Sequence, residues 1–186
     1  YGFEDPSKDE SQGRFLRACF RDCEVWMIYA PSQIQGNLTF LLNIGGLLKI
    51  RQSKKSPLPL ILMGDLNCPR TTSDVTAHMP WVTSPWDYKP NQKALKEVIS
   101  LFSAVDPGAK QHLFTWYPEP TSRNQVRRIG MRIDYMLHSP ELVVESYSVL
   151  SDVKGTDHRP VVISVTTPQR NAPIRVHPVI SKICPR

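Results

Sequence analysis

The stretch LPLILMGDLNCPR, residues 58–70, leads a short apolar run directly into Gly64, Asp65 and Asn67. An apolar run of this length, bounded by turn-forming residues, is typical of a strand in the interior of a sheet. Asp and Asn after a strand often do no more than form a turn, because their side chains bond nearby backbone groups. They can also be held at the rim of a sheet for chemistry. This stretch alone leaves both interpretations open.

The chain of 186 residues is long enough for one domain with a buried core. With 40% hydrophobic and 22% charged residues, its composition is ordinary for a soluble protein. Its longest apolar run, residues 38–48, contains Asn43, Gly45 and Gly46 and is too short to span a membrane. The first eleven residues are polar and acidic, unlike a signal peptide or a transit peptide.

The net charge of +6 favours a nucleic acid or another polyanion as partner, because binding would release counterions. The four cysteines, at positions 19, 23, 68 and 184, form no CxxC pair and no metal-ligand spacing with the histidines. Zinc binding is therefore not expected, and the pattern indicates free thiols in a reducing compartment.

Hydrophobic periodicity predicts an α/β chain that folds as a layered sandwich. Asn91 is the expected N-cap of a helix. Residues 69–90 are expected to form a long irregular loop. Residues 168–186 are expected to be an extended basic, proline-rich tail, either disordered or docked on a partner. The predicted elements are strands at 13–20 and 23–31, a helix at 35–52, a strand at 60–63, a helix at 91–104, and strands at 112–118, 132–137, 143–150 and 159–167.

Polar side chains recur at strand edges along the chain: Asp65 with Asn67, Asp134 within RIDYML, and Asp157 with His158 before the last strand. An acid in an apolar strand is costly to bury unless it is paired or binds a cation. Each position alone can be a turn, a cap or a paired core residue, but together they suit hydrolysis of a phosphate ester. That chemistry needs a carboxylate for water, a donor for phosphoryl oxygens and an oriented imidazole. A hard cation such as Mg²⁺ would take oxygen ligands from acids such as Asp157.

The motifs GDLN, RIDYML and GTDHRPV, in this order, resemble the endonuclease/exonuclease/phosphatase superfamily. The stretches YGFEDPSKDESQGRFLRACF, IYAPS and FTWYPEPTSRNQVRRIGMRIDYML resemble its exonuclease III-type apurinic/apyrimidinic endonucleases. The resemblance covers roughly residues 1–167. It implies a four-layered α/β sandwich of the DNase I type, with the active site where two sheets meet.

By resemblance, Asp65 activates the attacking water, Asn67 contacts the phosphate, and Asp134 orients the catalytic His158. Tyr29 corresponds to the active-site tyrosine, and Asp157 to an acid of the metal site. The implied protein is a Mg²⁺-dependent hydrolase, with Mn²⁺ as a substitute, acting on double-stranded DNA in repair. Its expected location is intracellular, in the nucleus or a mitochondrion. Candidate phosphate contacts are Arg123, Arg127, Arg128 and Arg132, although a solvated loop would explain these arginines equally well.

The chain departs from the family pattern in several ways. An Asn and a metal-binding Glu of the family lie on strands that precede the region where this sequence starts, so the domain is expected to lack its first strands. Met131 replaces an expected Trp, and Arg128 and Ser32 replace expected Asn residues. Three accounts remain open: an active nuclease whose missing part is a further segment, half of a domain completed by another polypeptide, or an inactive relative serving as a structural or nucleic-acid-binding subunit. A phosphatase or phosphodiesterase acting on another substrate is a further alternative.

Overall fold

The computed structural model describes residues 13–76, 89–111, 113–118, 130–153 and 155–167. Its elements in chain order are β1 (Phe15–Cys19), β2 (Glu24–Tyr29), α1 (Ile34–Gln52), β3 (Leu60–Asp65), the 3₁₀ turn η2 (Thr72–Asp74), α2 (Lys89–Leu101), the 3₁₀ turn η3 (Pro107–Lys110), β4 (Asp134–His138), β5 (Val143–Val149) and β6 (Val161–Thr166). The predicted α/β architecture is confirmed, and so are both helices and six of the seven predicted strands.

The main sheet has the strand order β1-β2-β3-β4. The apolar alternation on either side of the Arg21–Asp22 turn produces the antiparallel pair β1 and β2. Strand β3 then pairs with β2 in parallel, because α1 carries the chain back across the sheet between them. Strand β4 adds to β3 in antiparallel orientation. The ends of β2 and β3 and the start of β4 therefore lie at the same edge of the sheet.

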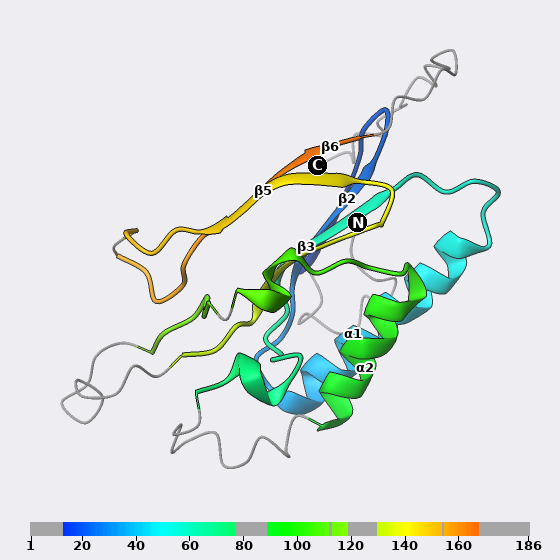
Figure 1. Ribbon diagram of the computed structural model, residues 1–186. Coiled ribbons are helices and arrows are strands. Elements are labelled where there is room, and N and C mark those ends of the chain that lie inside the picture. Colours follow the sequence, from blue (N-terminus) through cyan, green and yellow to red (C-terminus); the bar gives the residue numbers. More distant parts are fainter. Residues whose placement is uncertain (1–12, 77–88, 112, 119–129, 154, 168–186) are drawn as a thin grey trace, which may run out of the picture.

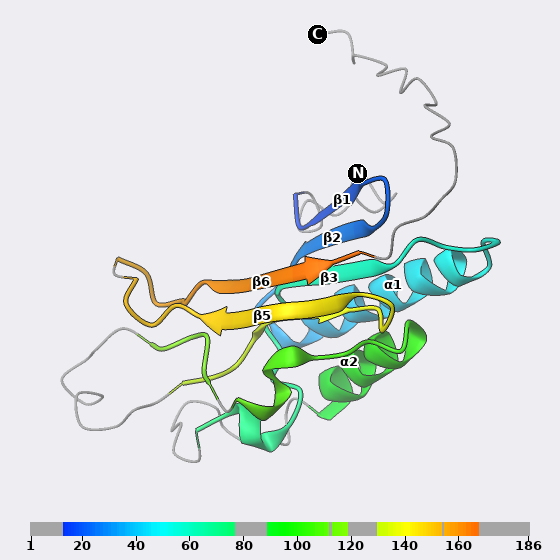
Figure 2. The same cartoon turned by 45° about the horizontal axis from the view of Figure 1, so that its top comes forward.

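Helices α1 and α2 pack on one face of this sheet, and the two-stranded sheet of β5 and β6 lies on the other side, as Figures 1 and 2 show. The helix-facing side carries the hydrophobic core, in which Trp26, Leu62 and Leu137 from three strands meet Leu48 and Leu95 from the helices. Alternation along a strand sends every second side chain to the opposite face. Met63 and Asp65, which flank Gly64 on β3, thus point away from the helices.

The second sheet is covered less completely. No side chain of β5 or β6 is fully buried, although residues such as Tyr147 and Ile163 are half-buried and apolar neighbours such as Val143 and Val162 are exposed. A sheet of two strands is marginally stable in water by itself. Its contacts with β4 and η3 hold it against the rest of the described structure.

Two sequence predictions are wrong in detail. Asn91 is not an N-cap, because α2 begins at Lys89 and Asn91 is buried within its first turn. Residues 113–118 form no named strand in the described structure. Trp116 instead makes isolated bridges with Met131 and His158. Residues 77–88 of the predicted loop and the tail 168–186 lie outside the described residues.

The described residues include three of the four cysteines. Cys19, Cys23 and Cys68 are free thiols. Among the helices described, none has the length and apolar content that a membrane span requires.

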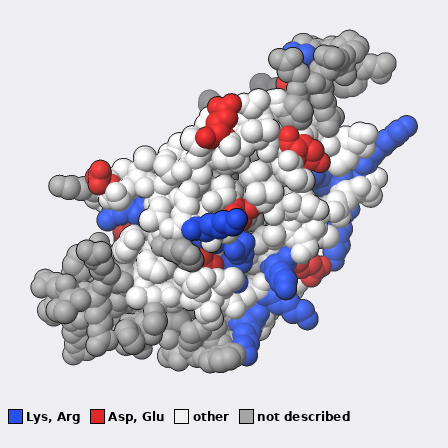
Figure 3. Space-filling model, viewed as in Figure 1, with Lys and Arg blue, Asp and Glu red and all other residues white. Residues whose placement is uncertain are grey.

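On the face shown in Figure 3, basic side chains gather along the side of the molecule that α1 and α2 form. The exposed lysines of these helices include Lys49, Lys93 and Lys96. These lysines lie on the helical layer, on the other side of the sheet from Asp65.

Gly64 is the residue of β3 that tolerates no side chain. Its φ of +126° is a conformation that L residues rarely adopt, and a Cβ there would collide with the backbone carbonyl of Ile28 on the neighbouring strand. We expect Gly64→Ala to lower the free energy of unfolding by about 1–3 kcal/mol, measured by urea denaturation. Gly46→Ala is the control, since Gly46 lies in α1 with open space around it and should gain roughly 0.5–1 kcal/mol. A Gly64→Ala protein as stable as the wild type would contradict the strand geometry.

Candidate active site

Three predicted site residues form a row across the main sheet. Tyr29 ends β2, Asp65 ends β3 and Asp134 begins β4, and the backbone register pairs Tyr29 with Asp65 and Asp65 with Asp134. Residues directly opposite each other on neighbouring strands point to the same face. The row therefore lies on the face away from the helices, where the strands end and loops can approach.

The turn after β3 fixes the carboxylate of Asp65. Asn67 has a left-handed backbone with φ of +44°, a conformation that Asn adopts more readily than most residues. Its backbone N–H donates to Oδ1 of Asp65 over 2.8 Å, and its side-chain Nδ2 donates to Oδ2 over 3.0 Å. The same Nδ2 donates to the carbonyl of Ala30 over 2.8 Å. Asn67 thus connects Asp65 to the loop after β2, and the prediction of a turn at GDLN is confirmed.

His158 reaches this row from the loop before β6. Its Nδ1 lies 3.0 and 3.2 Å from the two oxygens of Asp134, so the carboxylate fixes the orientation of the imidazole and leaves Nε2 as the other ring nitrogen. Thr115 fixes the backbone at Asp134, because its buried hydroxyl accepts hydrogen bonds from the backbone N–H groups of Ile133 and Asp134. The pairing expected between Asp134 and His158 is therefore present in the structure.

The pKa of Asp65 is raised to about 6, first by burial and then by the negative charge of Asp134 nearby. The hydrogen bonds from Asn67 and the presence of His158 oppose this shift but do not cancel it. A carboxyl group with such a pKa is a competent proton acceptor near neutral pH.

Asp65, Asp134 and His158 could together hold a metal ion. One ligand atom from each lies within 4.8 Å of those of the other two. The fit is chemically reasonable, because two neighbouring carboxylates repel each other, as the raised pKa of Asp65 reflects, and a cation between them would relieve that repulsion. Asp157 is not a member of this group of three. Its carboxylate accepts a hydrogen bond from the indole Nε1 of Trp116 over 2.8 Å.

Tyr29 is exposed over 57% of its surface at the open end of the row. The guanidinium of Arg14 lies over its ring, 5.0 Å from the ring centre. The phenol is therefore accessible to a ligand that approaches Asp65, and the cationic guanidinium of Arg14 lies beside the phenol.

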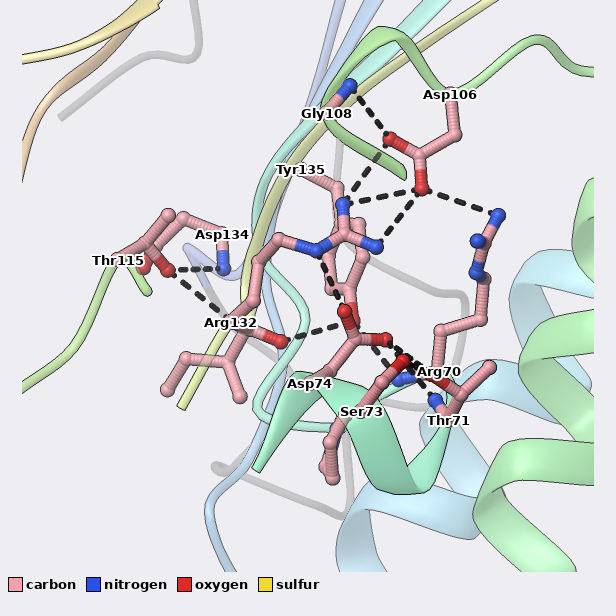
Figure 4. Close-up of polar contacts among 12 residues, drawn as sticks. Arg70, Thr71, Ser73, Asp74, Asp106, Gly108, Thr115, Arg132, Asp134 and Tyr135 are labelled. Atoms are coloured by element: carbon pink, nitrogen blue, oxygen red, sulfur yellow. Dashed lines mark hydrogen bonds and ion pairs between the residues drawn. The ribbon is translucent and has the colours of Figure 1, made fainter. Parts of the chain in front are cut away.

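Arg132 does not have the surface position that phosphate binding would require. It is only 2% exposed, and its guanidinium donates to Asp74 through Nε over 2.7 Å and to both oxygens of Asp106 over 3.0 Å (Figure 4). Its guanidinium is buried and paired with these two carboxylates, so the prediction of a nucleic-acid contact is wrong for this residue. The other three candidates, Arg123, Arg127 and Arg128, lie outside the described residues.

The network around Arg132 instead fixes the chain just before Asp134. Figure 4 shows Arg132 between Asp74 and Asp106, with Arg70 on the far side of Asp106 at 3.1 Å. Tyr135 also belongs to this network, since its buried hydroxyl donates to the backbone carbonyl of Arg132 over 2.9 Å. Sequence reasoning missed both Thr115 and this network, because each depends on partners far away along the chain.

Comparisons with known proteins concern the family and the fold of the chain. A family model described as the Endonuclease/Exonuclease/phosphatase family matches residues 43–158, more than half of the chain. A search of curated proteins found no match. Among solved structures, an AP endonuclease from Archaeoglobus fulgidus shares 22% identity and a TM-score of 0.68, over 88% of this chain and 68% of its own.

Two further solved structures show the same fold. The 3′ phosphatase NExo from Neisseria, bound to a product DNA hairpin, gives 18% identity and a TM-score of 0.64 over 88% of this chain and 66% of its own. The AP endonuclease LMAP from Leishmania major gives 17% identity and a TM-score of 0.67, over 89% of this chain and 57% of its own. The chain thus spans 57–68% of the length of these structures.

Proposed function

Because the chain belongs to the endonuclease/exonuclease/phosphatase family, we propose that it is a metal-dependent phosphodiester hydrolase that acts on DNA. The observation that carries this proposal is the convergence of Asp65, Asp134 and His158, from three separate segments, within 4.8 Å at one edge of the sheet. The reaction type is that of an apurinic/apyrimidinic endonuclease with 3′-exonuclease activity, and the process is DNA repair.

In the proposed reaction Asp65 accepts a proton from the attacking water, because Asn67 fixes its carboxylate at the point where Asp134 and His158 converge. His158, oriented through Nδ1 by Asp134, uses Nε2 to stabilise the negative charge that develops on the phosphoryl group. Asn67 contacts the phosphate by exchanging one of the two hydrogen bonds that its Nδ2 now donates to Asp65 and Ala30. Tyr29 offers its exposed hydroxyl as a further donor to the phosphate.

Mg²⁺, for which Mn²⁺ can substitute, is the proposed cofactor, because hard carboxylate oxygens dominate the donor set. Bound at the site, such an ion would supply charge stabilisation for the phosphoryl oxygens. Asp65 and Asp134 are the residues described that would hold it, and Asp157 is a further acid that would join them after releasing Trp116. The carboxylate of Asp134, together with burial, keeps the pKa of Asp65 high when no cation is bound.

Double-stranded DNA is the proposed substrate. Support comes from the net charge of +6 and from the resemblance to endonucleases. In addition, one of the structures similar to this chain, the 3′ phosphatase NExo, is described as bound to a DNA hairpin. Arg123, Arg127 and Arg128 stay candidates for backbone phosphate contacts. The nucleus or a mitochondrion is the proposed location, because these compartments hold DNA.

The alternative function is that of an inactive relative, serving as a structural or nucleic-acid-binding subunit. It is favoured by one observation: β5 and β6 form a small sheet without a fully buried side chain in a chain that spans 57–68% of its structural neighbours. The active interpretation instead includes the proposal that a further segment or another polypeptide completes this second sheet and contributes to the site.

The proposed function is tested by a substrate panel with Mg²⁺. The substrates are duplexes of one sequence that carry an abasic site, a 3′ phosphate or no lesion, together with the matching single strand. The proposal expects incision beside the abasic site to be the fastest reaction. Removal of the 3′ phosphate alone would instead assign a phosphatase. Binding to the duplex without reaction on any substrate would assign the structural, nucleic-acid-binding role.

A further inference from the structure

A buried carboxamide on α1 connects the two loops that carry the site. Asn37 is fully buried, and its Nδ2 donates to the carbonyl of Pro31 over 3.0 Å and to the carbonyl of Leu66 over 2.8 Å. Its Oδ1 accepts a hydrogen bond from Nδ2 of Asn91 over 2.8 Å. Both donors and the acceptor of this amide therefore have partners inside the protein.

The two carbonyls lie where backbone pairing between β2 and β3 ends. The last pair in the parallel register is Tyr29 with Asp65, followed by one hydrogen bond from the N–H of Ala30 to the carbonyl of Asp65. Beyond this point the strands no longer supply partners for each other, and an unpaired buried carbonyl costs about 1–3 kcal/mol. Asn37 supplies these partners from the helical side of the sheet.

Asn67 connects the same two loops independently, through its hydrogen bond to the carbonyl of Ala30. Two amides thus bridge the end of β2 and the end of β3: Asn67 beside the carboxylate of Asp65, and Asn37 beneath it. The helical contact determines the distance that Asn67 must span between Ala30 and Asp65. A shift of the Leu66 carbonyl would move both neighbours, Asp65 and Asn67.

We infer that Asn37 is a positioning residue for Asp65 and Asn67. Asn37 lies behind the sheet and acts through the Pro31 and Leu66 carbonyls. Its role in catalysis rests on the proposed function, whereas its role in fixing the Asp65–Asn67 turn does not. Asn91 supports Asn37 from the first turn of α2, where it also donates to the carbonyl of Ile34 over 2.8 Å. These hydrogen bonds account for the complete burial of both Asn side chains beside the hydrophobic core.

Asn37→Leu and Asn91→Leu separate this role from simple stabilisation. Both remove a buried amide of similar size, and both should lower the melting temperature, but only Asn37→Leu frees the Pro31 and Leu66 carbonyls. The first readout is hydrogen exchange of the Asn67 backbone amide, which now donates to Asp65. We expect at least about a tenfold faster exchange in Asn37→Leu than in Asn91→Leu, when both are measured equally far below their melting temperatures.

The second readout is catalysis on the abasic duplex. A misplaced base affects the chemical step, so Asn37→Leu should lower kcat by about 10–100-fold with little change in KM, and Asn91→Leu should lower it much less. If Asn37→Leu does not fold, Asn37→Ser, which keeps one donor, replaces it in both measurements. Equal exchange at Asn67 in the Asn37 and Asn91 variants would overturn the inference. A wild-type protein without activity would overturn the proposed function, and the exchange result would still decide the inference.

Discussion

Asp65→Asn is expected to lower the cleavage rate by about 10²–10⁴-fold, the range typical for removal of a general base. The substitution keeps the size of the side chain and one carbonyl oxygen that can accept the Asn67 backbone N–H. The new amide group cannot accept from Nδ2 of Asn67, but Nδ2 still donates to the carbonyl of Ala30, so the turn after β3 should persist. What it removes is the proton acceptor at the position where Asp134 and His158 converge. The rate is measured under single-turnover conditions, so that product release does not mask the chemical step.

The same substitution should stabilise the metal-free protein at neutral pH. The pKa of Asp65 is about 6 in the folded state, above the value of about 3.9 of an unperturbed Asp. The folded state therefore binds this proton more tightly than the unfolded state. The free energy of unfolding falls as pH rises from about 4 to 6, and the charged carboxylate destabilises the fold above that window. Asp65→Asn removes this penalty, so its melting temperature should exceed that of the wild type at pH 7.5 and approach it at pH 4.

Asp152→Asn is the matched control, because Asp152 is an exposed acid that accepts a hydrogen bond from Ser151 and is not part of the Asp65, Asp134 and His158 group. It should change neither the rate nor the pH dependence of stability. An Asp65→Asn protein with wild-type activity would remove Asp65 from the mechanism. A loss of stability at pH 7.5 with no gain at any pH would show that the charge of Asp65 is satisfied in the folded protein.

Arg132→Met is expected to lower the free energy of unfolding by about 3–5 kcal/mol, the range for removing one partner of a buried ion pair. Methionine has a similar length, so the loss comes mainly from Asp74 and Asp106, whose side chains are only 10% and 3% exposed and would lose their shared cation. Arg70 stays beside Asp106 and limits the damage. Urea denaturation at pH 7 measures the change.

Arg21→Met is the control for Arg132. The Arg21 side chain is 61% exposed and lies 3.9 Å from Asp22, so its loss should cost less than about 1 kcal/mol. If Arg132→Met unfolded at the same urea concentration as Arg21→Met but weakened DNA binding, the surface role first predicted for Arg132 would be correct and the buried network wrong.

The parts of the fold that the sequence predicts are those that depend on local sequence patterns. Apolar runs and periodicity located both helices and six strands, and with them the position of Asp65 at the end of β3 and of His158 in the loop before β6. The residues 113–118 look like a strand by composition, yet Trp116 pairs with Met131 and His158 only through single bridges. Composition records a preference for extended backbone, whereas a ladder also requires a neighbour in register over several residues.

The unpredictable parts depend on distant partners. Arg132 sits among other arginines in the sequence, which suggested a basic surface, but Asp74 lies 58 residues before it and Asp106 lies 26 before it. A single sequence shows the charge of an arginine and not the carboxylates that fold against it. Asn91 was misassigned for the same reason, since its partner Asn37 is 54 residues away on the other helix. Buried polar pairs of this kind appear only once the helices are packed.

Metal-dependent cleavage of a duplex with one abasic site, by the wild type and by His158→Ala, is the direct test of the proposed hydrolase. His158 is partly exposed, so its replacement should change stability little, while loss of its imidazole removes the group that Asp134 orients towards the reaction. We expect cleavage by the wild type only when Mg²⁺ is present, and a rate at least about 10²-fold lower for His158→Ala. Wild-type protein that is well folded but does not cleave with Mg²⁺, or cleavage that His158→Ala leaves unchanged, would contradict the proposed function.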